Sequence, residues 1–158
     1  MSIHFTCISM AIKLNAAAIL WLKIVLNSVY EYEDGDYCAE DVSSQVKAAG
    51  LDLTLREAES LKGLAEENQF LCEQENTPGV VYFSSHSANV EAIATLAQIL
   101  IRRFQLKPIG FCYACTADKF SLDAYGGGAY WITADEIEHT DAQNWLTERI
   151  NSVEPSAT

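Results

Sequence analysis

The chain has 158 residues, of which 49% are hydrophobic, and its 22 acidic and 10 basic side chains give a formal net charge of −12. This length and apolar content predict one folded domain with a hydrophobic core, over residues 1–151, followed by a flexible tail over residues 152–158. The charge argues against direct nucleic-acid binding, because that affinity comes from Lys and Arg displacing counterions. It favours a basic protein partner, or serves solubility alone.

The cysteine pattern and the N-terminal region bear on the compartment. Five cysteines at irregular spacing do not form a disulfide framework, so we expect a reducing, cytoplasmic setting. The apolar run from Leu14 to Leu22 is too short to span a bilayer and is followed at once by Lys23. We therefore expect neither a targeting segment nor membrane association.

The first elements in the chain are a strand and a helix. Ile3–Leu14 mixes alternation with β-branched residues, which predicts a strand. Asn15 is a good N-cap for a helix over residues 16–30, whose apolar residues cover more than one face. This helix is therefore predicted to be buried on two sides.

A helical insert is expected next. A weak amphipathic pattern over Val42–Ala49 ends at Gly50, a residue typical of helix C-termini. Thr54 and Glu57 have the spacing of a capping box and predict a helix that continues to about Asn68.

A hairpin and a long helix follow the insert. The strands Phe70–Glu75 and Val80–Ser85 are separated by a turn sequence. From Ser87 or Asn89 to Phe104, apolar residues recur at helical spacing.

The stretch from Ile109 to Thr133 is the most informative part of the chain. Ile109–Thr116 and Ala129–Thr133 are predicted strands on either side of a polar loop that ends in Gly126–Gly128. We expect this pair in the middle of the sheet. An edge strand over Ile137–His139 and a last helix over Ala142–Ile150, capped by Thr140 or Asp141, complete the chain.

This order of elements predicts an α+β protein. Without the insert, the first six elements spell βαββαβ, the ferredoxin-like or split βαβ order. We expect an antiparallel sheet with helices on one face, an inserted helical segment, and an extra C-terminal strand and helix.

No motif in the chain predicts catalysis. Cys112 and Cys115 match C-x-x-C but lie in a predicted strand, where they would point to opposite faces as two unrelated core cysteines. Gly126–Gly128 lacks the Lys-Ser/Thr pair and the helix of a phosphate loop, which favours a bulge or a close backbone approach. We expect no catalytic residue, no cofactor and no metal site, so the protein is not predicted to be an enzyme.

The acidic segment between the first two helices is the best candidate for a binding surface. It carries six acids, no base and several tyrosines that we expect to be exposed, a mixture common at protein interfaces, although a solvated loop has the same composition. The candidate partner-binding residues are Tyr30, Glu31, Tyr32, Glu33, Asp34, Asp36, Tyr37, Glu40 and Asp41, together with Asp135, Glu136 and Glu138 further along the chain.

One part of the sequence resembles a known group of proteins. Asp123–Ala129 (DAYGGGA) and Trp131–Asp135 (WITAD), with Arg102–Phe104 upstream and Trp145-Leu146 downstream, resemble small acidic proteins carried by phages and plasmids. Members of that group are mostly uncharacterised, so the resemblance implies a mobile genetic element and not a reaction.

These observations lead to three functional hypotheses. The first is a non-catalytic acidic binding protein that inhibits a host nucleic-acid-binding defence protein, of the anti-CRISPR or anti-restriction type, by charge complementarity. The second is a self-associating structural or housekeeping protein that forms a homodimer through its sheet or its apolar first helix. The third is a small thiol or metal protein that uses Cys112, Cys115 and a histidine.

Overall fold

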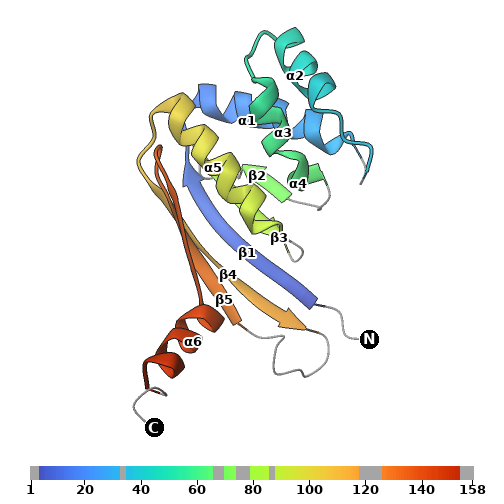
Figure 1. Cartoon of the computed structure of the whole chain (residues 1–158). Coiled ribbons are helices and arrows are strands. Elements are labelled where there is room, and N and C mark those ends of the chain that lie inside the picture. Colours follow the sequence, from blue (N-terminus) through green and yellow to red (C-terminus); the bar gives the residue numbers. More distant parts are fainter. Residues whose placement is uncertain are drawn as a thin grey trace.

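The computed structural model describes residues 4–32, 35–65, 70–73, 79–85, 88–117 and 126–153. Within these residues the protein is α+β, with an open antiparallel sheet in the strand order β2-β3-β1-β4-β5-β6. Figure 1 shows helices α1 to α5 gathered on one side of this sheet, while α6 lies apart from them beyond one end of β5. The predicted α+β class and antiparallel sheet are confirmed.

The strands and helices have the following bounds. The strands are β1 (His4–Lys13), β2 (Phe70–Glu73), β3 (Val80–Ser85), β4 (Ile109–Ala117), β5 (Gly126–Ile132) and β6 (Ile137–Asp141). The helices are α1 (Ala16–Tyr30), α2 (Ala39–Ala48), α3 (Leu55–Ser60), α4 (Lys62–Ala65), α5 (Val90–Phe104) and α6 (Ala142–Val153).

Side-chain caps place the helix starts where the sequence predicted them. The amide of Ala18 donates to the side chain of Asn15 at 2.8 Å, so α1 begins at its predicted residue. Thr54 and Glu57 form the predicted capping box at the start of α3. Asn89 caps α5 by accepting from the amide of Ala92 at 3.1 Å.

Several predictions of extent or position were wrong. Helix α2 begins at Ala39, three residues before its predicted start, and β6 extends to Asp141, two residues past its predicted end. The helix expected up to Asn68 is interrupted at Leu61, giving α3 and the single turn α4. The sheet is centred on β1 and β4, and not on the β4–β5 pair. Strand β5 already begins at Gly126. The last helix continues to Val153, so the first two residues of the expected tail are helical; the rest of that tail lies outside the described residues.

The register of the sheet separates its residues into two faces. Ile8 and Ile12 of β1 pair with Ser85 and Val81 of β3, and these alternate side chains are buried under the helices. The residues between them point the other way, because successive strand side chains alternate. Ser9, Ala11, Lys13, Ser84, Cys112, Ala114 and Trp131 lie on this second face, and all are exposed. We call it the open face.

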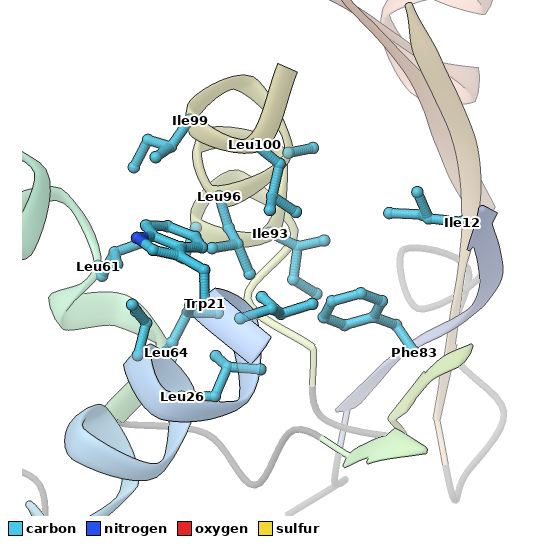
Figure 2. Close-up of a cluster of buried hydrophobic side chains, with 14 of the residues drawn as sticks. Ile12, Trp21, Leu26, Leu61, Leu64, Phe83, Ile93, Leu96, Ile99 and Leu100 are labelled. Atoms are coloured by element: carbon cyan, nitrogen blue, oxygen red, sulfur yellow. The ribbon is translucent and has the colours of Figure 1, made fainter. Parts of the chain in front are cut away.

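The core fills the space between the sheet and the helices. Figure 2 shows Ile12 and Phe83 pointing from the sheet toward Ile93 of α5, with Trp21 of α1 on the far side of α5 next to Leu61. All five side chains are buried.

The insert α2–α4 packs against the outer side of α1. Val42, Val46 and Leu53 are fully buried there, and the hydroxyl of Ser43 donates to the carbonyl of Leu53 at 2.6 Å. Helix α1 is consequently covered by the insert as well as by the rest of the core, as its apolar pattern predicted. In the described part of the chain, no helix is both long enough and apolar enough to cross a membrane.

Candidate functional site

The predicted partner-binding residues occupy two separate places. Tyr30, Glu31, Tyr32, Asp36, Tyr37, Glu40 and Asp41 lie where the chain passes from α1 to α2; we call this the acidic segment. Glu33 and Asp34 were predicted to belong to it but lie outside the described residues. Asp135 and Glu136 form the turn between β5 and β6, and Glu138 lies in β6. The two places lie on opposite sides of the molecule (Figure 1), so they do not form one surface.

Tyrosines fix the shape of the acidic segment. The rings of Tyr32 and Tyr37 pack edge to face with centroids 5.6 Å apart. The hydroxyl of Tyr37 donates to the carbonyl of Ala58 in α3, and that of Tyr32 donates to Asp41 at 3.4 Å. Burial, and then the nearby Tyr32 and Cys38, raise the pKa of Tyr37 to about 12, so its hydroxyl stays a donor at neutral pH.

These contacts correct one expectation. Tyr32 and Tyr37 were expected to be exposed, but both are half-buried, because they join the segment to α2 and α3; only Tyr30 is exposed. The carboxylates of Glu31, Asp36, Glu40 and Asp41 are exposed. In this segment the carboxylates are therefore exposed to solvent, while the rings of Tyr32 and Tyr37 pack against each other beneath them.

The acidic turn between β5 and β6 is held on α5. Arg102 donates from Nε to the carbonyl of Ala134 at 2.6 Å, and Gln98 donates to the carbonyl of Thr133 at 3.1 Å. The hydroxyl of Thr133 also accepts from the amide of Glu136 at 3.1 Å. These hydrogen bonds give the turn a structural role in connecting β5 to β6. The carboxylates of Asp135 and Glu136 remain exposed to solvent.

An aromatic ladder crosses three strands on the helix-covered face. His139 of β6 stacks on Tyr130 of β5 with centroids 4.3 Å apart, and Tyr130 stacks on Phe111 of β4 at 5.1 Å. The hydroxyl of Tyr113 lies 2.7 Å from Nε2 of His139. Burial, and then the charge of Asp141, raise the pKa of Tyr113. The sequence did not indicate this ladder, because its members become neighbours only through the strand register.

Two of the three glycines, Gly127 and Gly128, allow β5 to lie close to its neighbours. A methyl group at Gly128 would lie 2.7 Å from the hydroxyl oxygen of Tyr113, and one at Gly127 would overlap the carbonyl oxygen of Tyr113. The close backbone approach predicted for the run is therefore confirmed at Gly127 and Gly128, but not at Gly126.

The open face of the sheet carries a shallow groove of about 790 Å³, which the sequence also did not indicate. Its lining includes the small residues Ser9, Ala11, Cys112 and Ala129, with Trp131 beside them. Trp131 is 50% exposed, and its ring lies over Gly110, where an added methyl would be only 2.9 Å from it. The small residues that form this floor come from three strands, β1, β4 and β5, so the strand order brings them together.

Cys112 and Cys115 do not form a common site. Cys112 is exposed on the open face and Cys115 is half-buried on the opposite face, so the predicted opposition is confirmed, whereas the expected core position of Cys112 is wrong. Among the described residues, no group of His, Cys, Asp or Glu has the arrangement of a metal site. Comparison of the chain with protein-family models, curated proteins and solved structures finds no match.

Proposed function

We propose that the protein is a non-catalytic binding protein whose acidic segment docks on a basic protein. The observation that carries this proposal is the packed segment between α1 and α2, where the rings of Tyr32 and Tyr37 support exposed carboxylates. A pre-ordered surface loses less conformational entropy when it binds than a flexible acidic loop does. Charge complementarity would then speed the encounter and select basic partners.

The stabilisation of helix α2 explains only part of this acidity. Glu40 and Asp41 lie in the first turn of α2, where negative charge favours the helix. Glu31 and Asp36 lie outside α2, so the dipole of that helix does not account for them. We therefore assign the surplus acidity of the segment to binding.

The partner that fits this surface is a protein with a positively charged nucleic-acid groove. The protein has a net charge of −12, and the phosphate backbone that such a groove binds is negatively charged too. The resemblance to mobile-element proteins favours a host defence nuclease, or a related complex, as the partner. Inhibition would follow from occupation of the groove, with no reaction required of the inhibitor.

We further propose that the core belongs to the ferredoxin-like, split βαβ class. The order β2-β3-β1-β4 with all neighbours antiparallel, and with α1 and α5 as the helices after β1 and β3, supports this proposal. In that description α2–α4 is an insert, and β5, β6 and α6 extend the sheet.

Affinity capture from a bacterial lysate tests the binding proposal. We expect the chain to recover a nucleic-acid-handling protein at about 0.05 M NaCl and to lose it at about 0.5 M, because the Debye length falls from about 14 Å to about 4 Å. With the recovered partner purified, Asp36→Asn/Glu40→Gln should weaken binding about tenfold, equivalent to about 1.4 kcal/mol.

A matched control variant carries the same charge change elsewhere. Asp135→Asn/Glu136→Gln neutralises two exposed acids on the other side of the molecule and should leave affinity within about twofold, since distant surface charges act only through screened fields. Equal losses for the two variants would show a general charge effect and contradict the assignment to the acidic segment. Recovery that is indifferent to salt would contradict charge complementarity itself.

A further inference from the structure

Among the described residues, helix α6 packs on the sheet only near its first turn. None of its residues is buried, and the apolar side chains of Trp145, Leu146 and Ile150 are exposed by 54%, 49% and 47%. Their spacing places them in one stripe along the helix. A helix of 12 residues is marginal in water without tertiary packing, so the stripe requires a cover.

The described strands cover only the start of α6. Strand β6 ends at Asp141 and α6 begins at the next residue, so no loop allows the helix to fold back. Asp141 fixes the exit direction by accepting from the amide of Asn144 at 2.7 Å. Near the start of the helix, Trp145 lies beside Gly127–Ala129 and Thr140. The rest of α6 extends past the end of β5 (Figure 1).

The groove on the open face has the size and lining to accept this stripe. A helix of 12 residues is about 18 Å long, and the four neighbouring strands β1, β4, β5 and β6 span about 14 Å at their usual spacing. The small side chains of Ser9, Ala11 and Ala129 leave a floor into which larger apolar side chains can project.

Charge indicates which molecule provides the helix. The chain carries −12 overall, yet Glu138 is the only Asp, Glu, Lys or Arg among the residues lining the groove, and α6 carries one acid and one base, Glu148 and Arg149. A basic partner would find little to attract it here. A second copy, which is repelled by the acidic surfaces, can approach this nearly neutral pair of surfaces without that penalty.

We propose that two copies of the chain form a two-fold dimer in which α6 of each copy lies in the open-face groove of the other. Such an isologous arrangement uses the same helix–groove contact twice and leaves neither stripe exposed. It also leaves the acidic segments free, because they lie on the helix-covered side of the sheet (Figure 1).

Analytical ultracentrifugation of the full chain tests the dimer. Between about 1 and about 100 µM, where a dimer of modest interface dissociates, we expect the sedimenting mass to approach twice 17.5 kDa. Added salt should strengthen the dimer by screening the repulsion between acidic copies, whereas it should weaken capture of a basic partner. The two proposals can therefore fail independently. A monomer throughout this range would overturn the dimer.

Variants on the two faces of α6 locate the contact. Leu146→Glu/Ile150→Glu places two charges in the stripe and should give a monomer. Thr147→Glu/Asn151→Glu adds the same charge on the opposite side of the helix and should remain dimeric. Because α6 has no buried residue in the single chain, all variants should retain the far-ultraviolet circular dichroism and the thermal midpoint of the monomer core. Equal dissociation by both variants would overturn the stripe as the contact.

A variant in the groove distinguishes helix-in-groove from helix-on-helix pairing. Ala11 is exposed on the groove floor, so Ala11→Arg should also give a monomer. A mixture of Ala11→Arg with Leu146→Glu/Ile150→Glu should regain a dimer, because one intact helix–groove contact remains in the mixed pair. A dimeric Ala11→Arg variant, or a mixture that stays monomeric, would overturn the proposed arrangement.

Discussion

Arg103 makes several of the polar contacts that join the insert to the core. Its guanidinium donates to both carboxylate oxygens of Glu57, lies 3.6 Å from Asp52, and sits over the ring of Trp21 at 5.3 Å. The indole of Trp21 in turn donates to the carbonyl of Asp52 at 2.8 Å. One side chain of α5 thus holds α1, α3 and the loop between α2 and α3 together.

The carboxylate of Glu57 makes this junction sensitive to acid. Burial alone would raise the pKa of Glu57, but hydrogen bonds from Arg103 and Thr54 outweigh it and hold the pKa below its ordinary value. A carboxylate with a lowered folded-state pKa stabilises the protein above its unfolded pKa of about 4.3, and this contribution is lost as the pH falls through the folded value.

Glu57→Gln should therefore lower the free energy of unfolding most at neutral pH. Urea denaturation at a series of pH values should show a difference between wild type and variant that is constant above about pH 5.5 and shrinks toward pH 3. Glu59→Gln, which changes an exposed acid in the same helix, serves as the control and should show little difference at any pH. A Glu57→Gln difference that does not depend on pH would contradict the assigned pKa direction.

Some residue-level features could be predicted from sequence and others could not. The caps at Asn15 and Thr54 were predictable because they involve neighbours within one turn of helix. The inward packing of Tyr37 depends on Ala58, which belongs to another element, so composition pointed to an exposed tyrosine. The partners of Arg103 are equally distant in sequence. The sequence predicted only that Arg103 lies in the last turn of a helix.

At the scale of elements, strand β5 requires glycine at position 127 more than at position 126. Gly126 and Gly127 have nearly the same positive φ, 157° and 155°, which disfavours an alanine at both positions. Only at Gly127 would the added methyl overlap the backbone of β4; at Gly126 there is nothing within 4 Å.

Gly127→Ala should consequently destabilise the protein more than Gly126→Ala, by about 2 kcal/mol, the usual scale of overpacking in a rigid site. The difference between the two urea unfolding free energies isolates the close approach of β4 and β5. If the two variants were equally stable, the spacing between these strands would be wrong or freely adjustable.

The elements were predicted best where a periodic pattern decides the outcome. Strand β3 and helix α1 have the predicted bounds, and α5 and β4 differ from the predicted limits at a terminal residue. The first residues of β5 are glycines, which have low strand propensity, so pairing with β4 and β6 rather than composition makes them a strand. The single turn after the break at Leu61 is held by a distant residue, since the side chain of Asn89 donates to the carbonyl of Gly63 at 3.4 Å.

At the scale of the whole molecule, the acidic charge should limit stability at low salt. With 22 acids and 10 bases, the folded state concentrates like charges that the unfolded chain spreads apart. Raising NaCl from about 0.05 M to about 0.5 M should therefore raise Tm by a few degrees, as screening removes this repulsion. Differential scanning calorimetry provides the measurement.

The same experiment near the sequence pI of about 4.5 is the control, because the net charge there is close to zero and the salt effect should largely vanish. A salt-independent Tm at neutral pH would show that the acids are spaced widely enough not to oppose folding. That result would also weaken the argument that charge directs partner choice.

The global arrangement was only partly predictable. The order of elements predicted an antiparallel sheet, but the two acidic regions could not be assigned to different sides, because that separation depends on the strand order and on the packing of α5. The open-face groove has the same origin. Each strand contributes only one or two of its small residues, which are unremarkable until the register aligns them.

The central position of β1 has a consequence for synthesis. Both of its neighbours in the sheet come much later in the chain: β3 begins at Val80, and the pairing with β4 ends at Ala117. Ribosomes add about 5–20 residues per second, so β1 and the apolar helix α1 emerge on the order of several seconds before their first sheet partner. During that interval a hydrophobic strand and helix are available to chaperones, and the nascent chain is at its most vulnerable to aggregation.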